Sequence, residues 1–317
     1  MLELGGVQVQ CINALVRGVF GSNFRAGEFR FNLCDPRTRL DNTIVASRGF
    51  GCVVSINMDD PIQTVLDRVL TADPGGIVGV YLYGSSTTTG LGPESDVDLL
   101  LVTRRALTSQ ERASLVSTLL GLSGWKGHAD VFPEVANRRP LEVTSLVTAD
   151  LKPLVAAPWR DFQFGEWLRG DFVQGYVSEP ERDPDVVILL ATALASHRVL
   201  HGAALDTLVT DVPFALLKDA QLAALPALVD DLDGEPRNVL LTLARALHTV
   251  ETGAIVAKDQ AAAVAARRVD PAGADLLLAA AREYLGEGQV DWDRESSQVS
   301  SLAQSLITLI QRTSAEA

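Results

Sequence analysis

The chain has 317 residues, enough for two domains with cores of their own. Its formal net charge of −13 argues against nucleic acid as a partner, because phosphate backbones are bound by basic surfaces. No apolar run approaches the roughly eighteen residues that a membrane-spanning helix needs, and a signal-peptide pattern is absent from the first residues. We therefore expect a cytoplasmic protein that binds neither nucleic acid nor membrane.

The N-terminal segment, residues 1–57, differs in composition from the rest. Its apolar residues follow no sustained helical or strand period, and it contains all three cysteines, Cys11, Cys34 and Cys52. Met58 follows directly and stands before Asp59-Asp60-Pro61, which has the composition of a helix start. We expect residues 1–57 to be an extension outside the folded domains, with Met58 as an alternative start. A genuine accessory segment is the other interpretation.

From Met58 to about residue 157, helix and strand patterns alternate. Helices are expected near residues 62–71 and 109–122, and strands at 77–83, 96–103 and 141–147. Short strands mixed with two helices predict a single sheet covered on one side. We assign residues 58–157 to this sheet domain.

After Pro158 the strand patterns stop, and helical periodicity with a high Ala and Leu content takes over. Helices are expected at residues 162–174, 185–201, 214–232, 238–252, 259–268, 272–285 and 296–312. Such a run of helices predicts a helical bundle over residues 158–312. The expected fold class is therefore α+β, with a sheet domain followed by an all-helical domain.

A short motif joins the first two expected strands. Gly84-Ser85 leaves strand 77–83, and Asp96 and Asp98 open strand 96–103. Because successive strand side chains alternate faces, the two carboxylates point the same way and lie about 6–7 Å apart. Such a pair suits one or two divalent cations, and the Gly-Ser turn offers backbone N–H groups to phosphate oxygens. The motif predicts a site for a magnesium nucleotide.

An Asp-x-Asp pair alone carries little weight in so acidic a chain. Further pairs occur at Asp183/Asp185, Asp231/Asp233 and Asp291/Asp293, where turns and helix caps are the ordinary interpretation. The pair at Asp96 differs because it opens an apolar strand behind a Gly-Ser turn. Glu142, a lone charge near the start of strand 141–147, adds a third carboxylate if the two strands are neighbours. In isolation Glu142 would be an exposed strand-end charge.

Gly84-Ser85, Asp96 with Asp98, and Glu142 on a later strand resemble the nucleotidyltransferase superfamily. Longer blocks resemble its streptomycin and spectinomycin adenylyltransferases: residues 139–144, 158–160, 163–169, 234–245, 252–253 with 258–259, and 284–286. These blocks keep the family's order from about Met58 to about Gly286. The resemblance implies a nucleotidyltransferase-type mixed β-sheet followed by an all-helical bundle.

The resemblance also implies an activity, the ATP-dependent O-adenylylation of an aminoglycoside or aminocyclitol antibiotic. The acceptor would be the 3''-hydroxyl of streptomycin, the 9-hydroxyl of spectinomycin or both, with release of pyrophosphate and antibiotic resistance as the result. Asp96, Asp98 and Glu142 would hold Mg²⁺, and Glu142 would also take the hydroxyl proton as general base. Acidic helical walls would receive the cationic drug, and we expect a monomer.

The family pattern assigns further residues to the two substrates. Residues matching positions at ATP are Gly84, Ser85, Ser95, Asp185, Arg245, Lys258 and Tyr284. Without the resemblance, Lys258 would be an ordinary surface lysine and Asp185 a helix N-cap. By resemblance, Lys258 binds the triphosphate as a point charge.

Residues matching positions at the antibiotic are Trp167, Glu235, Asn238 and Asp231. By pattern alone Trp167 would belong to the core, whereas by resemblance it stacks against streptomycin. Glu235 stands where the family usually has Asp, and Pro236 replaces an acid. These two departures from the family pattern argue against streptomycin as a substrate more than against spectinomycin.

Two other functions remain open at this point. One is a nucleotidyltransferase with another acceptor, such as a lincosamide or a protein. The other is a nucleotide-binding pseudoenzyme. The long helical domain argues against a minimal protein-modifying antitoxin, and the intact set of three acids argues against a pseudoenzyme.

Overall fold

The computed structural model describes residues 30–32, 43–47, 53–57, 61–87, 96–209 and 211–316. The chain divides into two compact units, Met1–Thr64 and Val65–Ala317. In the first unit, strands β1 (Arg30–Asn32), β2 (Thr43–Ser47) and β3 (Val53–Asn57) pair antiparallel in that order. The cysteines and Met58 lie outside the described residues, and the expectation that residues 1–57 are an extension stays a prediction.

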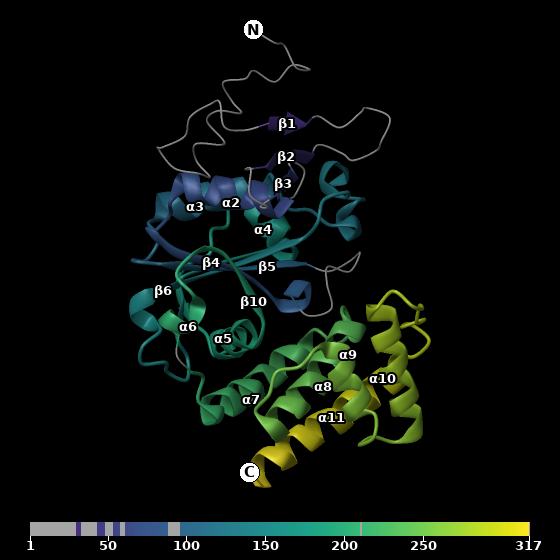
Figure 1. Ribbon diagram of the computed structural model, residues 1–317. Helices are drawn as coiled ribbons and strands as arrows, with labels where there is room; N and C mark the ends of the chain where they lie inside the picture. Colours follow the sequence, from purple (N-terminus) through teal and green to yellow (C-terminus); the bar gives the residue numbers. More distant parts are fainter. Residues whose placement is uncertain are drawn as a thin grey trace. The chain divides into compact units, whose positions relative to one another are not determined.

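The second unit contains a five-stranded mixed sheet (Figure 1). Its strands are β4 (Ile77–Tyr83), β5 (Val97–Thr103), β6 (Leu141–Val147), β8 (Phe162–Gly165) and β10 (His197–Gly202), in the order β10-β4-β5-β6-β8. Strands β5 and β6 run parallel and are connected through α3 (Ser109–Leu120), whereas the remaining neighbours are antiparallel. The expected strands 77–83, 96–103 and 141–147 are thereby confirmed.

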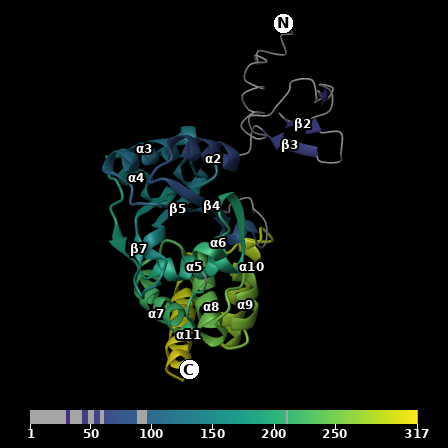
Figure 2. The ribbon, with the colours of Figure 1, turned by 60° about the vertical axis from the view of Figure 1, so that its left-hand side comes forward.

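Both faces of this sheet are covered, so the expectation of a sheet covered on one side is wrong. Helices α2 (Pro61–Ala72) and α3 lie on one face, and α5 (Asp185–Ala195) and α6 (Leu205–Leu208) lie on the other (Figures 1 and 2). On the second face, Leu100 and Val102 pack with Val186 and Leu190 of α5. The sequence did indicate a sheet covered on both faces, because β5 contains the continuous apolar run 99–102, which is typical of strands buried on both faces.

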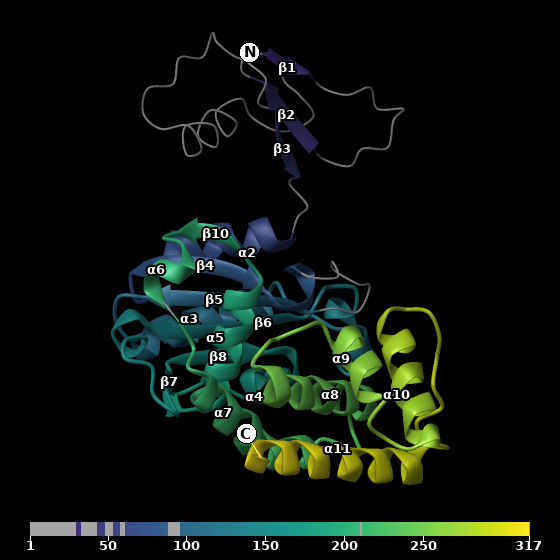
Figure 3. The same cartoon turned by 60° about the horizontal axis from the view of Figure 1, so that its bottom comes forward.

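The C-terminal half is a group of packed helices (Figure 3). These are α7 (Phe214–Asp230), α8 (Pro236–Thr252), α9 (Lys258–Ala265), α10 (Pro271–Tyr284) and α11 (Ser296–Glu316). Leu240, Leu277 and Leu306 are among the fully buried residues of their shared core. Among the described helices, none is long and apolar enough to cross a membrane.

Helix α5 joins the sheet to these helices. Its residues Val186 and Leu190 pack on the sheet, while Val187 and Ala191 pack against Leu217 of α7 and its neighbours. A helix that is apolar on two sides in this way is buried between two layers. It therefore fixes where the helical half meets the sheet.

Two segments expected to be helical contain strands. Residues 162–174 form β8, the 3₁₀ turn η5 (Glu166–Leu168) and the short helix α4 (Arg169–Val173), because the first four residues pair with β6. Residues 185–201 divide into α5 and β10, which pairs with β4. A further strand pair, β7 (Trp159–Arg160) with β9 (Glu181–Arg182), also follows Pro158. The domain boundary at residues 157 and 158 stays a prediction.

Candidate active site

A row of paired residues crosses the sheet at the end where the predicted acids lie. Tyr83 pairs with Asp98, Asp98 with Glu142, and Glu142 with Gly165. Paired residues on neighbouring strands project to the same face of a sheet. The carboxylates of Asp98 and Glu142 are therefore adjacent, on the face that α5 covers further along the strands. We call this line of paired residues, Tyr83, Asp98, Glu142 and Gly165, the acidic row.

Gly84 brings the Gly-Ser turn close to these acids. Its backbone has the left-handed φ of +72°, and a Cβ at this position would lie 1.9 Å from Asp98 Oδ2. Glycine is therefore required both by the turn and by the close approach to the carboxylate. Ser85 lies in the same turn, η1 (Gly84–Thr87), which is held by hydrogen bonds from Thr87 Oγ1 to the carbonyls of Gly84 (3.0 Å) and Ser196 (3.2 Å).

The three predicted acids act on one another electrostatically. Burial and the charges of Glu142 and Asp96 raise the pKa of Asp98 well above its usual value. Burial, followed by the charge of Asp96, raises the pKa of Glu142 to about 7. Burial is also the main cause that raises the pKa of Asp96. These shifts follow from like charges held together away from bulk water.

The donor set fits a hard divalent cation. Within the described ranges, no group of three or more His, Cys, Asp or Glu side chains is arranged to hold a metal ion as it stands. Even so, Asp98 and Glu142 offer adjacent carboxylate oxygens, the donors that Mg²⁺ prefers. A cation between them would relieve the repulsion that, together with burial, raises the pKa of Asp98.

Two cationic side chains from the helical half act on the same acids. Lys258 opens α9 and donates a hydrogen bond to Asn238 Oδ1 near the start of α8. Burial and the charge of Arg245 lower the pKa of Lys258 to about 7, while Asp98 and Asp96 oppose the shift. The structure thus groups Lys258 and Asn238 with the acidic row.

Arg245, on α8, is the second cation. Burial lowers the pKa of Arg245, and the nearby Tyr284 and Asp98 oppose that change. Tyr284 is the last residue of α10. Glu235, at the N-cap position of α8, raises the pKa of Asp96 through its charge. These residues also lie around the row.

Some predicted residues are not brought to the row by the interactions described. Asp185 begins α5, and its N–H donates to Asp183 Oδ1 at 2.9 Å. Burial and the charge of Asp183 raise the pKa of Asp185. The carbonyl of Asp231 shapes the turn before α8 by accepting the N–H of Glu235 at 2.9 Å. Ser95 lies outside the described residues.

Trp167 is a surface residue beside Glu142. It lies in η5 and is 56% exposed, so the pattern-based expectation of a core tryptophan does not hold. A Cβ at Gly165 would lie 2.3 Å from the indole ring. The ring therefore covers Gly165, which is the partner of Glu142 in the sheet. An exposed aromatic face next to an acidic row is suited to a cationic ring compound.

One buried acid at the site was not singled out from the sequence. Glu166 is 4% exposed, and its charge raises the pKa of Asp96. It lies between Gly165 and Trp167 and pairs with Arg169 three residues later. That i,i+3 spacing of opposite charges was the available signal, but the expected helix over residues 162–174 made it an ordinary surface pair.

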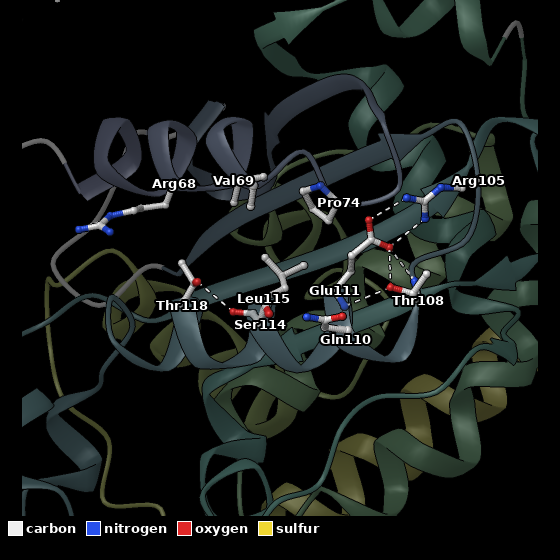
Figure 4. A pocket seen from close by; sticks show the side chains of 11 residues that line it. Arg68, Val69, Pro74, Arg105, Thr108, Gln110, Glu111, Ser114, Leu115 and Thr118 are labelled. Carbon is white, nitrogen blue, oxygen red and sulfur yellow. Dashed lines mark hydrogen bonds and ion pairs between the residues drawn. The ribbon is translucent and has the colours of Figure 1, made fainter.

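A pocket of about 410 Å³ lies elsewhere, between α2 and α3 (Figure 4). Its lining includes Arg68, Pro74, Leu115 and an ion pair between Arg105 and Glu111 at 2.8 Å. It is on the opposite face of the sheet from the acidic row. The predicted site residues within the described ranges are not part of its lining.

The sheet topology, together with paired carboxylates beside a Gly-Ser turn, defines the protein as a nucleotidyltransferase. Comparison with solved structures agrees. The crystal structure of spectinomycin adenyltransferase AAD(9) from Enterococcus faecialis, with ATP and spectinomycin, matches with a TM-score of 0.73 and 28% identity, covering 80% of this chain and 98% of that one.

Sequence comparison narrows the class. The family model of the aminoglycoside adenylyltransferase C-terminal domain matches residues 207–308. A spectinomycin 9-adenylyltransferase from Campylobacter jejuni is 36% identical over 243 residues, which are 77% of this chain and 92% of the relative. An aminoglycoside (3'') (9) adenylyltransferase from Escherichia coli is 34% identical over 228 residues, 71% of this chain and 83% of the relative. The chain belongs to the aminoglycoside adenylyltransferase family.

Proposed function

We propose that the protein transfers AMP from ATP to a hydroxyl group of an aminocyclitol or aminoglycoside antibiotic and so confers resistance. The observation that carries this function is the Asp98–Glu142 pair, which stands beside the Gly84 turn and is opposed by Lys258 and Arg245. The 9-hydroxyl of spectinomycin is the first acceptor to consider, because two spectinomycin 9-adenylyltransferases are similar over 92% and 94% of their lengths. The 3''-hydroxyl of streptomycin is the second.

The reaction is an in-line displacement at the α-phosphorus of ATP. The acceptor oxygen forms a bond to phosphorus, the bond to the bridging oxygen breaks, and pyrophosphate leaves. Glu142 takes the hydroxyl proton, because its carboxylate stands opposite Asp98 at the site and can accept it. Lys258 and Arg245 bind the triphosphate through their positive charges.

Magnesium completes the proposed site. Asp98 and Glu142, with Asp96, would hold Mg²⁺, which neutralises charge on the attacking and leaving oxygens. Most of the remaining rate enhancement comes from holding two charged substrates in one orientation. Because the acids and the cations come from a single chain, we expect a monomer to be active.

The antibiotic would lie against the helical half. Trp167 supplies an aromatic face, and Glu235 and Asn238 stand at the start of α8, where they can meet amino or guanidinium groups. Asp231 contributes through the turn that places Glu235. Ser85 and Tyr284 would complete the ATP side.

The test is pyrophosphate release from ATP and Mg²⁺ with spectinomycin, streptomycin, kanamycin or lincomycin as the acceptor. We expect release with spectinomycin, and a product whose mass has increased by one AMP group. The variant Asp98→Asn, assayed in parallel, controls for contaminating activity. Release with lincomycin alone would show that the acceptor is a lincosamide and not an aminocyclitol or aminoglycoside. No release with any acceptor would refute the proposed function.

A further inference from the structure

Glu166 is a buried carboxylate that has no role in the proposed mechanism. It directly follows Gly165, the residue that pairs with Glu142. Its side chain accepts hydrogen bonds from Ser123 Oγ and Arg169 Nε, both at 2.5 Å, and lies 3.1 Å from His128 Nδ1. Its side-chain exposure is 5%, and that of Arg169 is 4%. A buried ion pair with this many partners has a fixed geometry.

Ser123 connects Glu166 to the strand that carries Glu142. The serine is fully buried, and while its hydroxyl donates to Glu166, its oxygen accepts the N–H of Leu141 at 3.1 Å. Leu141 is the first residue of β6 and directly precedes Glu142. One hydroxyl therefore joins the start of β6 to the turn η5.

Arg169 closes the same network from the other side. Its Nη2 donates to the carbonyls of Ser123 at 2.8 Å and Leu120 at 3.2 Å. The end of α3 and the segment after it are thus tied to η5. The result is a rigid frame around Glu166, formed by Ser123, Leu141 and Arg169.

Glu166 also lies between the two residues that shape the surface beside Glu142. Gly165 precedes it and pairs with Glu142, and Trp167 follows it and covers Gly165. Because Trp167 is 56% exposed, packing alone does not hold its ring in place. The position of the indole therefore depends on the backbone on either side of Glu166 as well as on the contact with Gly165.

We propose that Glu166 is a positioning residue for the adenylyl transfer, and that it acts with Ser123 to hold the indole of Trp167 and the start of β6 in one arrangement. The acceptor then meets the carboxylate of Glu142 at the correct distance and angle. This inference rests on the proposed function. A displacement of the reacting groups by about 1 Å can cost on the order of a hundredfold in rate.

The chain provides a matched control at the other end of β8. Asp161 directly precedes this strand, is 3% exposed, and pairs with the equally buried Arg112 at 2.5 Å. Asp161 and Arg112 thus form a second buried carboxylate–arginine pair, at the opposite end of β8 from Glu166. If Glu166 mattered for stability alone, Asp161→Asn and Glu166→Gln would have the same effect on turnover.

The experiment compares Glu166→Gln, Ser123→Ala and Asp161→Asn in the full chain, assayed well below their melting temperatures. We expect kcat/KM for the antibiotic to fall by about tenfold to a hundredfold in the first two variants, with KM for ATP within about threefold of the parent. In Asp161→Asn we expect a lower melting temperature and nearly unchanged kinetics. Ser123→Ala leaves the ion pair with Arg169 intact, so it provides the test if Glu166→Gln does not fold.

Hydrogen exchange gives a second measurement that does not depend on turnover. The Leu141 amide and the amides of residues 165–168 should exchange faster in Glu166→Gln than in Asp161→Asn. Equal kinetic losses in both variants, or parallel losses for antibiotic and ATP, would overturn the positioning role. A parent protein that is inactive with every acceptor would instead refute the proposed function.

Discussion

Asp98 and Glu142 stand directly opposite each other on the parallel strands β5 and β6. The register places two half-buried carboxylates side by side. Burial and the charge of Glu142 raise the pKa of Asp98, and burial and the charge of Asp96 raise the pKa of Glu142. Such an arrangement is unfavourable unless positive charge is brought to it. Lys258 and Arg245 supply part of that charge from the helical half. Positive charge carried by a bound substrate would lower the cost of holding these carboxylates together.

Replacing Asp98 by Asn should abolish turnover without unfolding the protein. The loss of one electrostatic stabiliser is expected to lower kcat by about 10²–10³. Because the change removes one of two repelling charges, the melting temperature should stay the same or rise. The control is Asp293→Asn, an exposed acid from another Asp-x-Asp pair. Full activity of Asp98→Asn with a normal melting curve would exclude a role for this carboxylate.

Replacing Glu142 by Gln should affect the rate more than ATP binding. The amide occupies the same space but cannot accept the hydroxyl proton. We expect a large fall in kcat together with a dissociation constant for ATP close to that of the parent, measured by titration calorimetry. Turnover within a few-fold of the parent would show that another group accepts the proton.

The pairing of Asp98 with Glu142 could be predicted from the sequence because its signals are local. The apolar runs around Asp98 and Glu142 identified β5 and β6, and the helix between them made parallel pairing natural. Strands β8 and β10 were missed because their short segments form strands only by pairing with β6 and β4. The importance of Glu166 was missed for a related reason, since its partner Ser123 is distant in the sequence.

Replacing Trp167 by Ala should impair streptomycin modification more than spectinomycin modification. Streptomycin offers guanidinium groups to an aromatic face, and loss of a cation–π contact costs about 0.5–2 kcal/mol. The measurement is kcat/KM for each drug. The control is Trp159→Ala, which removes a similarly surface-exposed tryptophan that contacts Arg182 instead.

Gly165→Ala tests the role of the Trp167 indole in a second way, without changing Trp167 itself. The added methyl group would lie 2.3 Å from the indole and must displace it, although the φ of −149° suits any residue. We expect its loss of activity to follow the drug preference of Trp167→Ala. Equal losses for both drugs in the two variants would assign Trp167 a purely structural role.

The ion pair between Arg105 and Glu111 should make the free energy of unfolding depend on pH. Hydrogen bonds from Arg105 and from the backbone of Thr108 hold the pKa of Glu111 far below its usual 4.5. A carboxyl group with a lower pKa in the folded state stabilises the fold above its unfolded pKa, and this contribution is lost as the pH falls through the folded pKa.

Glu111→Gln should therefore lower the melting temperature at pH 7, and the difference from the parent should shrink as the solution is acidified below about pH 4.5. Glu287→Gln, a change at an exposed glutamate, should show no such trend. A difference in melting temperature between Glu111→Gln and the parent that stays constant as the pH falls would mean that the ion pair with Arg105 does not stabilise the fold through the charge of Glu111.

A chain that begins at Met58 should be as active and as stable as the full chain. This start keeps α2 whole, including Ile62 and Val65, which are 6% and 1% exposed. A chain that begins at Val65 would lack the first turn of α2 and should melt at a lower temperature. If residues 1–57 contributed apolar surface to the core, their removal would cost about 25 cal/mol per Å² and lower the stability by several kcal/mol. Urea unfolding of the three chains, with pyrophosphate release as the activity assay, decides between these outcomes.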